Sequence, residues 1–333
     1  MPPLVSILIP AFNAQEWLAE TLCSALAQTW ARIEVVVVDD GSRDETPAIA
    51  RRFAHPNVQV VTQSNQGAAA ARNRAFTLCQ GDYVQWLDAD DLLAPNKIAL
   101  QMELVERDAN DRWLYSAGWA SFMYRPHRAV FAPTLLWEDL SPVEWLLRKW
   151  ENDIYMQTAT WLVSRRLTQA AGLWDTSLLG DDDGEYFSRV IQASQAVRFA
   201  PDAKVLYRRT GSNSLSYVGL SSRKMEAQFR GMKLQIGYLR AMTDDTRARG
   251  ACIKYLQSWL PQFYPNRMDL VEEAFQIAAD LGGRLVTPRL SWNYDWIRKL
   301  FGWNLAKRAD LTYNHCKGSL LRSWDKTLFR LGT

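Results

Sequence analysis

The sequence predicts an α/β fold in which a mostly parallel sheet is sandwiched by helices and is followed by a helical C-terminal region. Short strand-like runs alternate with helical patterns through the first hundred residues, and these runs, VSILI, EVVVVD, VQVVT and YVQWL, are rich in Val, Ile and Leu. Nearly continuous apolar strands separated by helices are typical of parallel sheets that are buried on both faces. Residues 222 to 283 then have the apolar spacing of helices.

The first helix is predicted to begin soon after the first strand. Asn13 can cap it, and Glu16, three residues later, completes the pattern of a capping box. The buried stripe of this helix is then formed by Trp17, Leu18, Leu22, Ala25 and Leu26.

The next three helices have start signals of their own. Thr46 followed by Pro47 begins the second helix, Gly67 precedes the third, and Pro95 stands at the start of the fourth. The polar residues between strands and helices therefore gather at the carboxyl ends of the strands, the edge at which open α/β sheets bind ligands.

The pattern is mixed from about residue 110 to residue 215. We expect short strands in WLYSAGWASFMY, TWLVS and VRFAP, and helices in ENDIYMQ and DGEYFSRVIQAS. A domain boundary is predicted near residue 216, which gives a first domain at 1–215 and a helical region at 216–333.

Composition narrows the class of protein. The 333 residues are 48% hydrophobic, which is enough for a substantial core, and a net charge of +3 is too mild to indicate nucleic-acid binding. The four cysteines form no CxxC pair, and Cys23 and Cys79 fall within helical patterns, so we expect buried free thiols and a reducing cytoplasm. A first strand beginning near Val5 leaves no room for a secretory signal, and no run of 18 apolar residues predicts a membrane span.

The C-terminal tail is basic and rich in Trp. From Arg289 onward it has nine Lys or Arg against three Asp, which is +6, and the first 288 residues carry −3. At helical spacing Trp296, Leu300 and Trp303 share one face, and Trp292 and Trp324 lie in the same tail. Two interpretations remain open: a stripe packed on the first domain, or a peripheral contact with anionic lipid at the inner face of the membrane.

Several common site motifs are absent from the sequence. No GxGxxG follows the first strand, where PAFNAQE stands instead, and there is no GxxxxGK[ST], GxSxG or HExxH. Three scattered histidines cannot build a His-rich metal site. These absences disfavour a dinucleotide enzyme, a P-loop enzyme, an α/β-hydrolase and a zinc protease.

Three groups of acids remain as candidates. Asp39 and Asp40 end an apolar strand, and they either cap a helix as solvated charges or bind a ligand. Asp88 and Asp90 follow the strand YVQWL, and alternate residues on an extended strand present both carboxylates to one hard cation. The acids at 181 to 183 precede a helix, where they are favoured either by the macrodipole or by a role as general base.

Five ordered motifs between about residues 4 and 215 resemble the family 2 glycosyltransferases, which have the GT-A fold. The motifs are VSILIPAFNAQEWLAETL, VVVVDDGSRDET, QGAAAARNRAF, GDYVQWLDADD and DDDGEYFSRV. The resemblance implies an inverting, metal-dependent hexosyltransferase that moves a sugar from a nucleotide sugar, most simply UDP-linked, to a glycan or lipid-linked acceptor in polysaccharide biosynthesis.

The same resemblance implies roles for individual residues. The nucleotide sugar would be contacted by Pro10, Ala11, Phe12, Asn13, Glu16, Asp39, Arg72, Asp88 and Ala89. Asp90 would bind Mg²⁺ or Mn²⁺, and Arg208 or Arg209 would reach the phosphates. Where many relatives have Glu-Asp this chain has Asp182-Asp183, and the family pattern puts Asp183 at the position of the general base.

Two other classes of function fit the sequence less well. A non-catalytic nucleotide-sugar-binding protein would share the fold, but the complete acidic clusters argue against it. A nucleotidyltransferase would have a Gly-rich, basic loop after the first strand, and PAFNAQE is neither.

Overall fold

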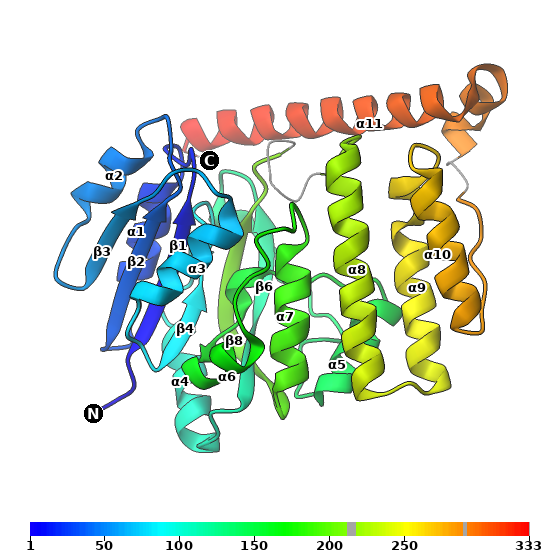
Figure 1. Ribbon diagram of the computed structural model, residues 1–333. Coiled ribbons are helices and arrows are strands. Elements are labelled where there is room, and N and C mark those ends of the chain that lie inside the picture. Colours follow the sequence, from blue (N-terminus) through cyan, green and yellow to red (C-terminus); the bar gives the residue numbers. More distant parts are fainter. Residues whose placement is uncertain (212–217, 289–291, 333) are drawn as a thin grey trace.

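Figure 1 shows a computed structural model of the chain, which describes residues 1–211, 218–288 and 292–332. The first sheet has the strand order β3-β2-β1-β4-β7. Strands β1 to β4 are parallel and β7 is antiparallel, so the prediction of a mostly parallel sheet is confirmed. The five strands are β1 (Val5–Ala11), β2 (Ile33–Asp39), β3 (Val58–Thr62), β4 (Tyr83–Trp86) and β7 (Val163–Ser164).

Helices cover both faces of this sheet, and the alternation of side chains along the strands decides which helix meets which face. On one face, Leu8, Val36 and Trp86 pack with α3 (Ala68–Leu78). On the other face, Ile7 and Val35 pack with three helices. These are α1 (Leu18–Leu26), α2 (Thr46–Arg52) and α4 (Lys97–Asp108).

The predicted capping box of the first helix is wrong. The helix α1 begins at Leu18, and no side chain caps it. Asn13 has a left-handed backbone with φ 48°, and its Oδ1 accepts a hydrogen bond from Arg43 N at 2.9 Å. Glu16 pairs with Lys326 of the C-terminal helix at 2.8 Å. The loop before α1 is therefore held by distant residues, which delays the start of the helix by a turn.

A second, three-stranded sheet has the order β5-β8-β6. It consists of β5 (Leu92–Leu93), β6 (Trp113–Phe122) and β8 (Ala196–Arg208). Short elements join the two sheets: η1 (Pro126–Arg128), α5 (Pro142–Glu151), η2 (Thr158–Thr160), α6 (Arg165–Ala171) and α7 (Asp182–Ala193). The helix expected in ENDIYMQ is wrong, because α5 ends at Glu151 and Asp153 has φ 50°.

The C-terminal region is helical, as predicted. It contains α8 (Ser222–Met242), α9 (Thr246–Phe263), α10 (Met268–Asp280) and α11 (Trp292–Arg330). The predicted boundary near residue 216 lies outside the described residues. No helix within the described ranges is both long and apolar enough to cross a bilayer.

Figure 1 shows α11 running along one side of the molecule, from α9 and α10 to the edge of the first sheet. Trp303 packs on Tyr264 with ring centroids 4.8 Å apart, and Asp325 pairs with Arg125 at 2.8 Å. Gly302 interrupts the helix with φ 80°, so Leu300 and Trp303 do not share one helical face. The shared face predicted from the sequence is therefore wrong for these two residues. Leu300 is exposed, and the side chains of Trp292 and Trp296 lie outside the described part.

The expectation of buried thiols holds for half of the cysteines. Cys79 and Cys252 are buried, whereas Cys23 and Cys316 are exposed. Cys23 lies on the outer side of α1, away from the stripe formed by Leu18, Leu22 and Ala25.

Candidate active site

The loops after β1, β2 and β4 meet at the carboxyl edge of the sheet. Ala11, the last residue of β1, pairs in register with Asp39, the last residue of β2, and Pro10 pairs with Val38. Phe12 follows directly and is 48% exposed, so its ring is available to a ligand at this edge. The predicted first-loop residues therefore lie beside the predicted acid.

Asp39 and Asp40 have different roles, and neither is a solvated charge. Asp40 is buried, and its carboxylate accepts hydrogen bonds from Gln66 N at 2.9 Å and Gly67 N at 2.8 Å. It therefore holds the loop that leads into α3. Asp39 is also buried, but its Oδ2 has no hydrogen-bond partner among the described residues. An unpaired buried oxygen is unfavourable, and a ligand N–H would satisfy it.

Arg72 connects two of the acidic groups. Its Nη2 lies 2.8 Å from Asp88 Oδ1 and its Nη1 lies 2.7 Å from Asp182 Oδ2. The guanidinium is buried and stacks over the Trp174 ring at 4.3 Å. Burial opposes the charge of Arg72, but the two carboxylates outweigh it and raise the pKa of Arg72, which therefore remains charged. Arg72 thus brings together residues that are far apart in the sequence.

The acids after β4 lie in a turn and not on an extended strand, which corrects the geometry predicted for them. The strand ends at Trp86, and Asp91 N donates to Asp88 O at 3.1 Å across the turn. Burial and the neighbouring Asp88 raise the pKa of Asp90 to about 7. Ala89, between them, is buried, and its carbonyl accepts from Thr21 Oγ1 at 3.0 Å.

Asp91 and Arg208 hold this turn in place. Asp91 is fully buried, and it accepts hydrogen bonds from Arg208 N at 2.8 Å and from Gln157 Nε2. The Arg208 side chain donates to Asp90 O at 2.8 Å and pairs with Glu20 at 2.6 Å.

The Arg208 guanidinium also lies 4.4 Å from the ring centroids of both Trp17 and Phe122. This side chain is therefore enclosed and braces the acidic turn, and its contact with a phosphate stays a prediction. Arg209 is exposed, and residues 212–217 of the segment that follows it lie outside the described part.

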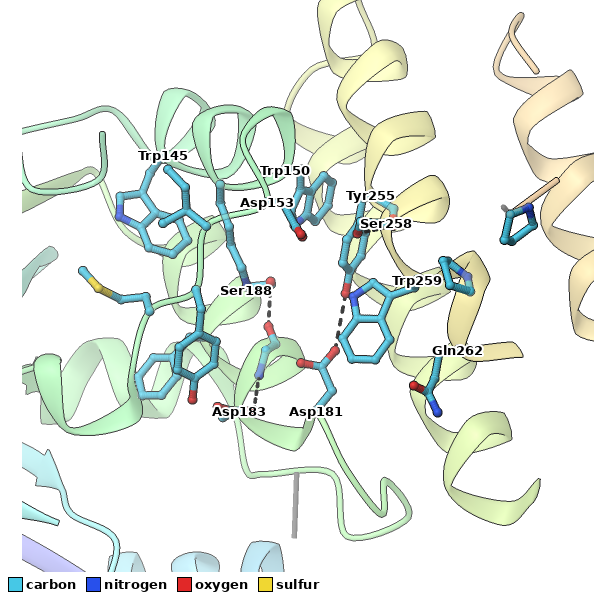
Figure 2. Close-up of a pocket in the computed structure, with 18 of the residues that line it drawn as sticks. Trp145, Trp150, Asp153, Asp181, Asp183, Ser188, Tyr255, Ser258, Trp259 and Gln262 are labelled. Carbon is cyan, nitrogen blue, oxygen red and sulfur yellow. Dashed lines mark hydrogen bonds between the residues drawn. The ribbon is translucent and has the colours of Figure 1, made fainter. Parts of the chain in front are cut away.

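The three acids at the start of α7 have three different environments. Asp181 Oδ2 accepts from Gln228 Nε2 at 2.9 Å and Gln235 Nε2 at 2.8 Å. Burial and Asp183 raise the pKa of Asp181 to about 6. Asp182 is paired with Arg72. Asp183 lines a cavity, as Figure 2 shows.

The carboxylate of Asp183 has weaker contacts than those of its two neighbours. Its Oδ2 lies 3.4 Å from Thr158 Oγ1, and its Oδ1 accepts from Gly184 N at 2.9 Å. Its position in the cavity leaves the carboxylate reachable by a bound hydroxyl group.

Trp174 and Tyr155 also belong to this site, although the sequence did not single them out. Trp174 lies under Arg72, and Tyr155 lines the cavity together with Asp183. Trp174 comes a few residues before the acidic cluster, and this closeness in the sequence is the one feature that could have indicated it as a site residue. No sequence feature indicated Tyr155, because it lies in a segment that is predicted to be helical.

The residues near Asp90 fit a divalent cation that a diphosphate completes. No group of three or more His, Cys, Asp or Glu suited to a metal was found within the described ranges. Mg²⁺ is usually held by one or two carboxylates together with substrate phosphates, so Asp90, with Asp88 near it, could serve as its protein ligand. Burial and the negative charge of Asp88 raise the pKa of Asp90, and a bound cation would offset both effects.

Comparison with known proteins identifies relatives of the first half of the chain. Residues 6–168 match the model of glycosyl transferase family 2. Chondroitin synthase of Escherichia coli is 39% identical over 116 residues, which are 34% of this chain and 17% of that protein. An uncharacterized glycosyltransferase of Rickettsia typhi is 36% identical over 129 residues, which are 39% of this chain and 40% of that protein. The chain therefore spans less than half the length of these curated relatives.

Solved structures resemble a larger part of the chain. The crystal structure of S. aureus TarS 1–349 in complex with UDP-GlcNAc has a TM-score of 0.68 at 16% identity, over 83% of this chain and 81% of that one. The complex of the same protein with UDP has a TM-score of 0.65 at 17% identity, over 82% and 80% of the two chains. At such identities the likeness shows the fold. Residues 6–168, just under half of the chain, thus resemble glycosyl transferase family 2, and the chain has the GT-A fold.

Proposed function

We propose that this protein is a metal-dependent, inverting glycosyltransferase that moves a sugar from a UDP-linked donor to a glycan or lipid-linked acceptor in polysaccharide biosynthesis. The observation that carries the proposal is the arrangement around Arg72. This residue joins the acidic turn after β4 to Asp182 at the start of α7, and this link supports a donor site beside the proposed base Asp183.

Each part of the site has a chemical role in this proposal. Asp39 Oδ2 accepts an N–H of the nucleotide base, and Phe12 lies beside that base. Asp183 takes the proton from the acceptor hydroxyl as this attacks the sugar carbon. A cation held by Asp90, with Asp88 near it, would supply Lewis-acid stabilisation of the departing diphosphate. Arg72 fixes Asp88 and Asp182, so that the two sides of the site keep their separation.

A screen of nucleotide sugars tests this function. UDP and UDP-sugars are expected to raise the melting temperature in the presence of Mn²⁺ more than GDP-sugars do, because a ligand that binds only the folded state stabilises it. Release of UDP from a UDP-sugar would then separate an enzyme from the alternative, a non-catalytic binding protein. Stabilisation without any turnover, with a range of acceptors, would favour that alternative, and no stabilisation by any nucleotide sugar would contradict the proposal.

We further propose that the protein acts in the cytoplasm and contacts the inner face of a membrane through α11. The side of this helix that carries Arg322, Asp325 and Lys326 contacts the rest of the protein. Tyr313, Leu320 and Trp324, at helical spacing on the opposite side, are 58%, 72% and 65% exposed. The tail from Arg289 carries +6. An apolar face flanked by basic residues suits an anionic lipid surface.

Replacing Leu320 and Trp324 together by Glu is expected to lower binding to phosphatidylglycerol-containing vesicles by roughly tenfold or more, since two apolar anchors are lost. Co-sedimentation at low salt measures this. The matched control is Val130→Glu, because Val130 is an exposed apolar residue outside the tail, at 79% exposure. If the wild-type protein does not sediment with these vesicles, the membrane contact is wrong.

A further inference from the structure

The cavity that Asp183 lines has a volume of about 550 Å³ and extends from the first domain into the C-terminal helices. This size is typical of small-molecule sites. We call it the aromatic cavity. Its aromatic walls include Trp145, Trp150, Tyr155, Tyr255, Trp259 and Trp303. In Figure 2, Trp145 lies on one side and Trp259 on the other, with Asp181 and Asp183 between them.

The aromatic rings are rigidly held and carry polar edges. Trp150 and Tyr255 stack with centroids 4.7 Å apart and an interplanar angle of 5°. The indole Nε1 atoms of Trp145 and Trp150 are buried and have no hydrogen-bond partner among the described residues. Buried donors of this kind normally have a hydrogen-bond partner, so these two indoles leave the cavity wall incompletely paired.

The cavity wall also includes apolar side chains such as Ile154, Met156 and Leu311, but the polar groups among them argue against a lipid chain as the occupant. Ser258 and Gln262 contribute donors and acceptors, and Asp183 contributes a carboxylate. An acyl chain would remove these groups from water without pairing them, which is unfavourable. A sugar ring has C–H faces for aromatic rings and hydroxyl groups for carboxylates and amides.

The charges of the cavity are mainly negative. Four carboxylates line it, and two lysines oppose them. The carboxylates are Asp153, Asp181, Asp183 and Asp310, and the lysines are Lys149 and Lys307. The Lys307 ammonium donates to the carbonyls of Pro261, Gln262 and Tyr264 at 2.9, 2.8 and 2.7 Å, which uses its three hydrogens. Lys149 is the other cation of the wall, and its ammonium lies 5.9 Å from the centroid of the Trp145 ring. Four carboxylates therefore outnumber the cations, so an anionic group in the cavity would meet mainly like charge, which disfavours it.

We propose that the aromatic cavity binds the acceptor, and that the acceptor unit held there is an uncharged sugar rather than a uronate or a phosphorylated unit. The inference rests on the proposed function, because it places the acceptor hydroxyl at Asp183. It also gives the C-terminal region a role in binding, because α9 and α11 supply Trp259, Trp303 and Asp310 to the wall.

A matched pair of ligands tests the charge preference. Methyl β-glucoside and methyl β-glucuronide differ only in the carboxylate at C6, and the corresponding galactoside and galacturonide form a second pair. Saturation-transfer difference NMR, with and without UDP and Mn²⁺, measures their binding. Neutral glycosides are expected to bind better than their uronates by roughly tenfold or more. Equal or tighter binding of the uronates, or binding of neither glycoside, would overturn the inference.

Substitutions in the wall of the aromatic cavity test whether the glycosides bind there. Trp259→Ala is expected to lower the affinity for the neutral glycosides roughly tenfold, whereas Trp259→Phe, which keeps an aromatic ring, should lose less. Trp324→Ala is the matched control, because that Trp is 65% exposed on α11 and outside the cavity. Unchanged binding by Trp259→Ala would place the glycosides elsewhere and refute the inference.

A third variant separates charge from packing. Asp153→Asn removes one negative charge, and Asn tolerates the left-handed backbone at φ 50°. This variant is expected to reduce the difference in affinity between the glucoside and the glucuronide. UDP affinity measured by calorimetry keeps the two proposals distinct. Failure of UDP to bind the wild-type protein would count against the glycosyltransferase proposal, whereas normal UDP binding with no effect of the cavity variants would count only against the acceptor site.

Discussion

Asp183→Asn is expected to lower turnover by roughly 10² to 10⁴, the usual contribution of a positioned general base. The change is nearly isosteric, so UDP affinity and the melting temperature should remain close to those of the wild type. Asp183 lines the cavity, and its Oδ2 has only a 3.4 Å contact with Thr158 Oγ1, so this oxygen can receive a proton from an acceptor hydroxyl. The carboxamide of Asn cannot act as this base.

Asp182→Asn is the matched comparison, one residue away. Asp182 Oδ2 is 2.7 Å from Arg72 Nη1, so its carboxylate is already occupied by a cation. We expect this variant to lower turnover much less, and to act mainly through Arg72 on donor affinity. The measurement is kcat at saturating donor and acceptor for both variants. If Asp182→Asn has no measurable turnover and Asp183→Asn has a kcat close to that of the wild type, the assignment of the base is wrong by one residue. If both variants are active, the acidic cluster only caps α7.

The sequence predicts the sheet well because strand burial leaves a local signal. Runs such as VSILI and EVVVVD are apolar on both faces, and these segments form adjacent parallel strands in register. The edge at which the loops gather follows from that topology alone. The family pattern then indicated Asp183 rather than Asp182, but the structural difference between the two is a contact with Arg72, 110 residues away.

The predictions that were wrong depend on contacts between distant parts of the chain. Asn13 looked like a helix cap, but its side chain binds the loop after β2. Arg208 is held between Trp17 and Phe122, and its neighbours in the sequence give no sign of this enclosure. The crossing of α11 over the first domain depends on pairs such as Lys326 with Glu16, 310 residues apart. No local periodicity encodes such pairs.

Asp90→Asn is expected to lower transfer by roughly 10³ or more and to remove the effect of Mn²⁺ on UDP binding. A bound cation contributes several kcal/mol of charge stabilisation to a departing diphosphate, and Asp90 is the proposed protein ligand. The Asp90→Asn variant is expected to keep the wild-type fold. Asp90 lies among Asp88 and Asp91, and burial and Asp88 raise its pKa to about 7, so removing its charge relieves repulsion. The melting temperature without ligand should therefore remain or rise.

Calorimetric titration of UDP, with Mn²⁺ and then with EDTA, measures the metal effect for the wild type and for Asp90→Asn. Asp202→Asn is the control for the loss of one carboxylate, because Asp202 is exposed on β8. We expect the control to bind UDP like the wild type under both conditions. Because the cation would join Asp90 to the diphosphate, wild-type affinity should fall on addition of EDTA to the level of the variant. Equal wild-type affinity in Mn²⁺ and in EDTA would rule out this role for Asp90.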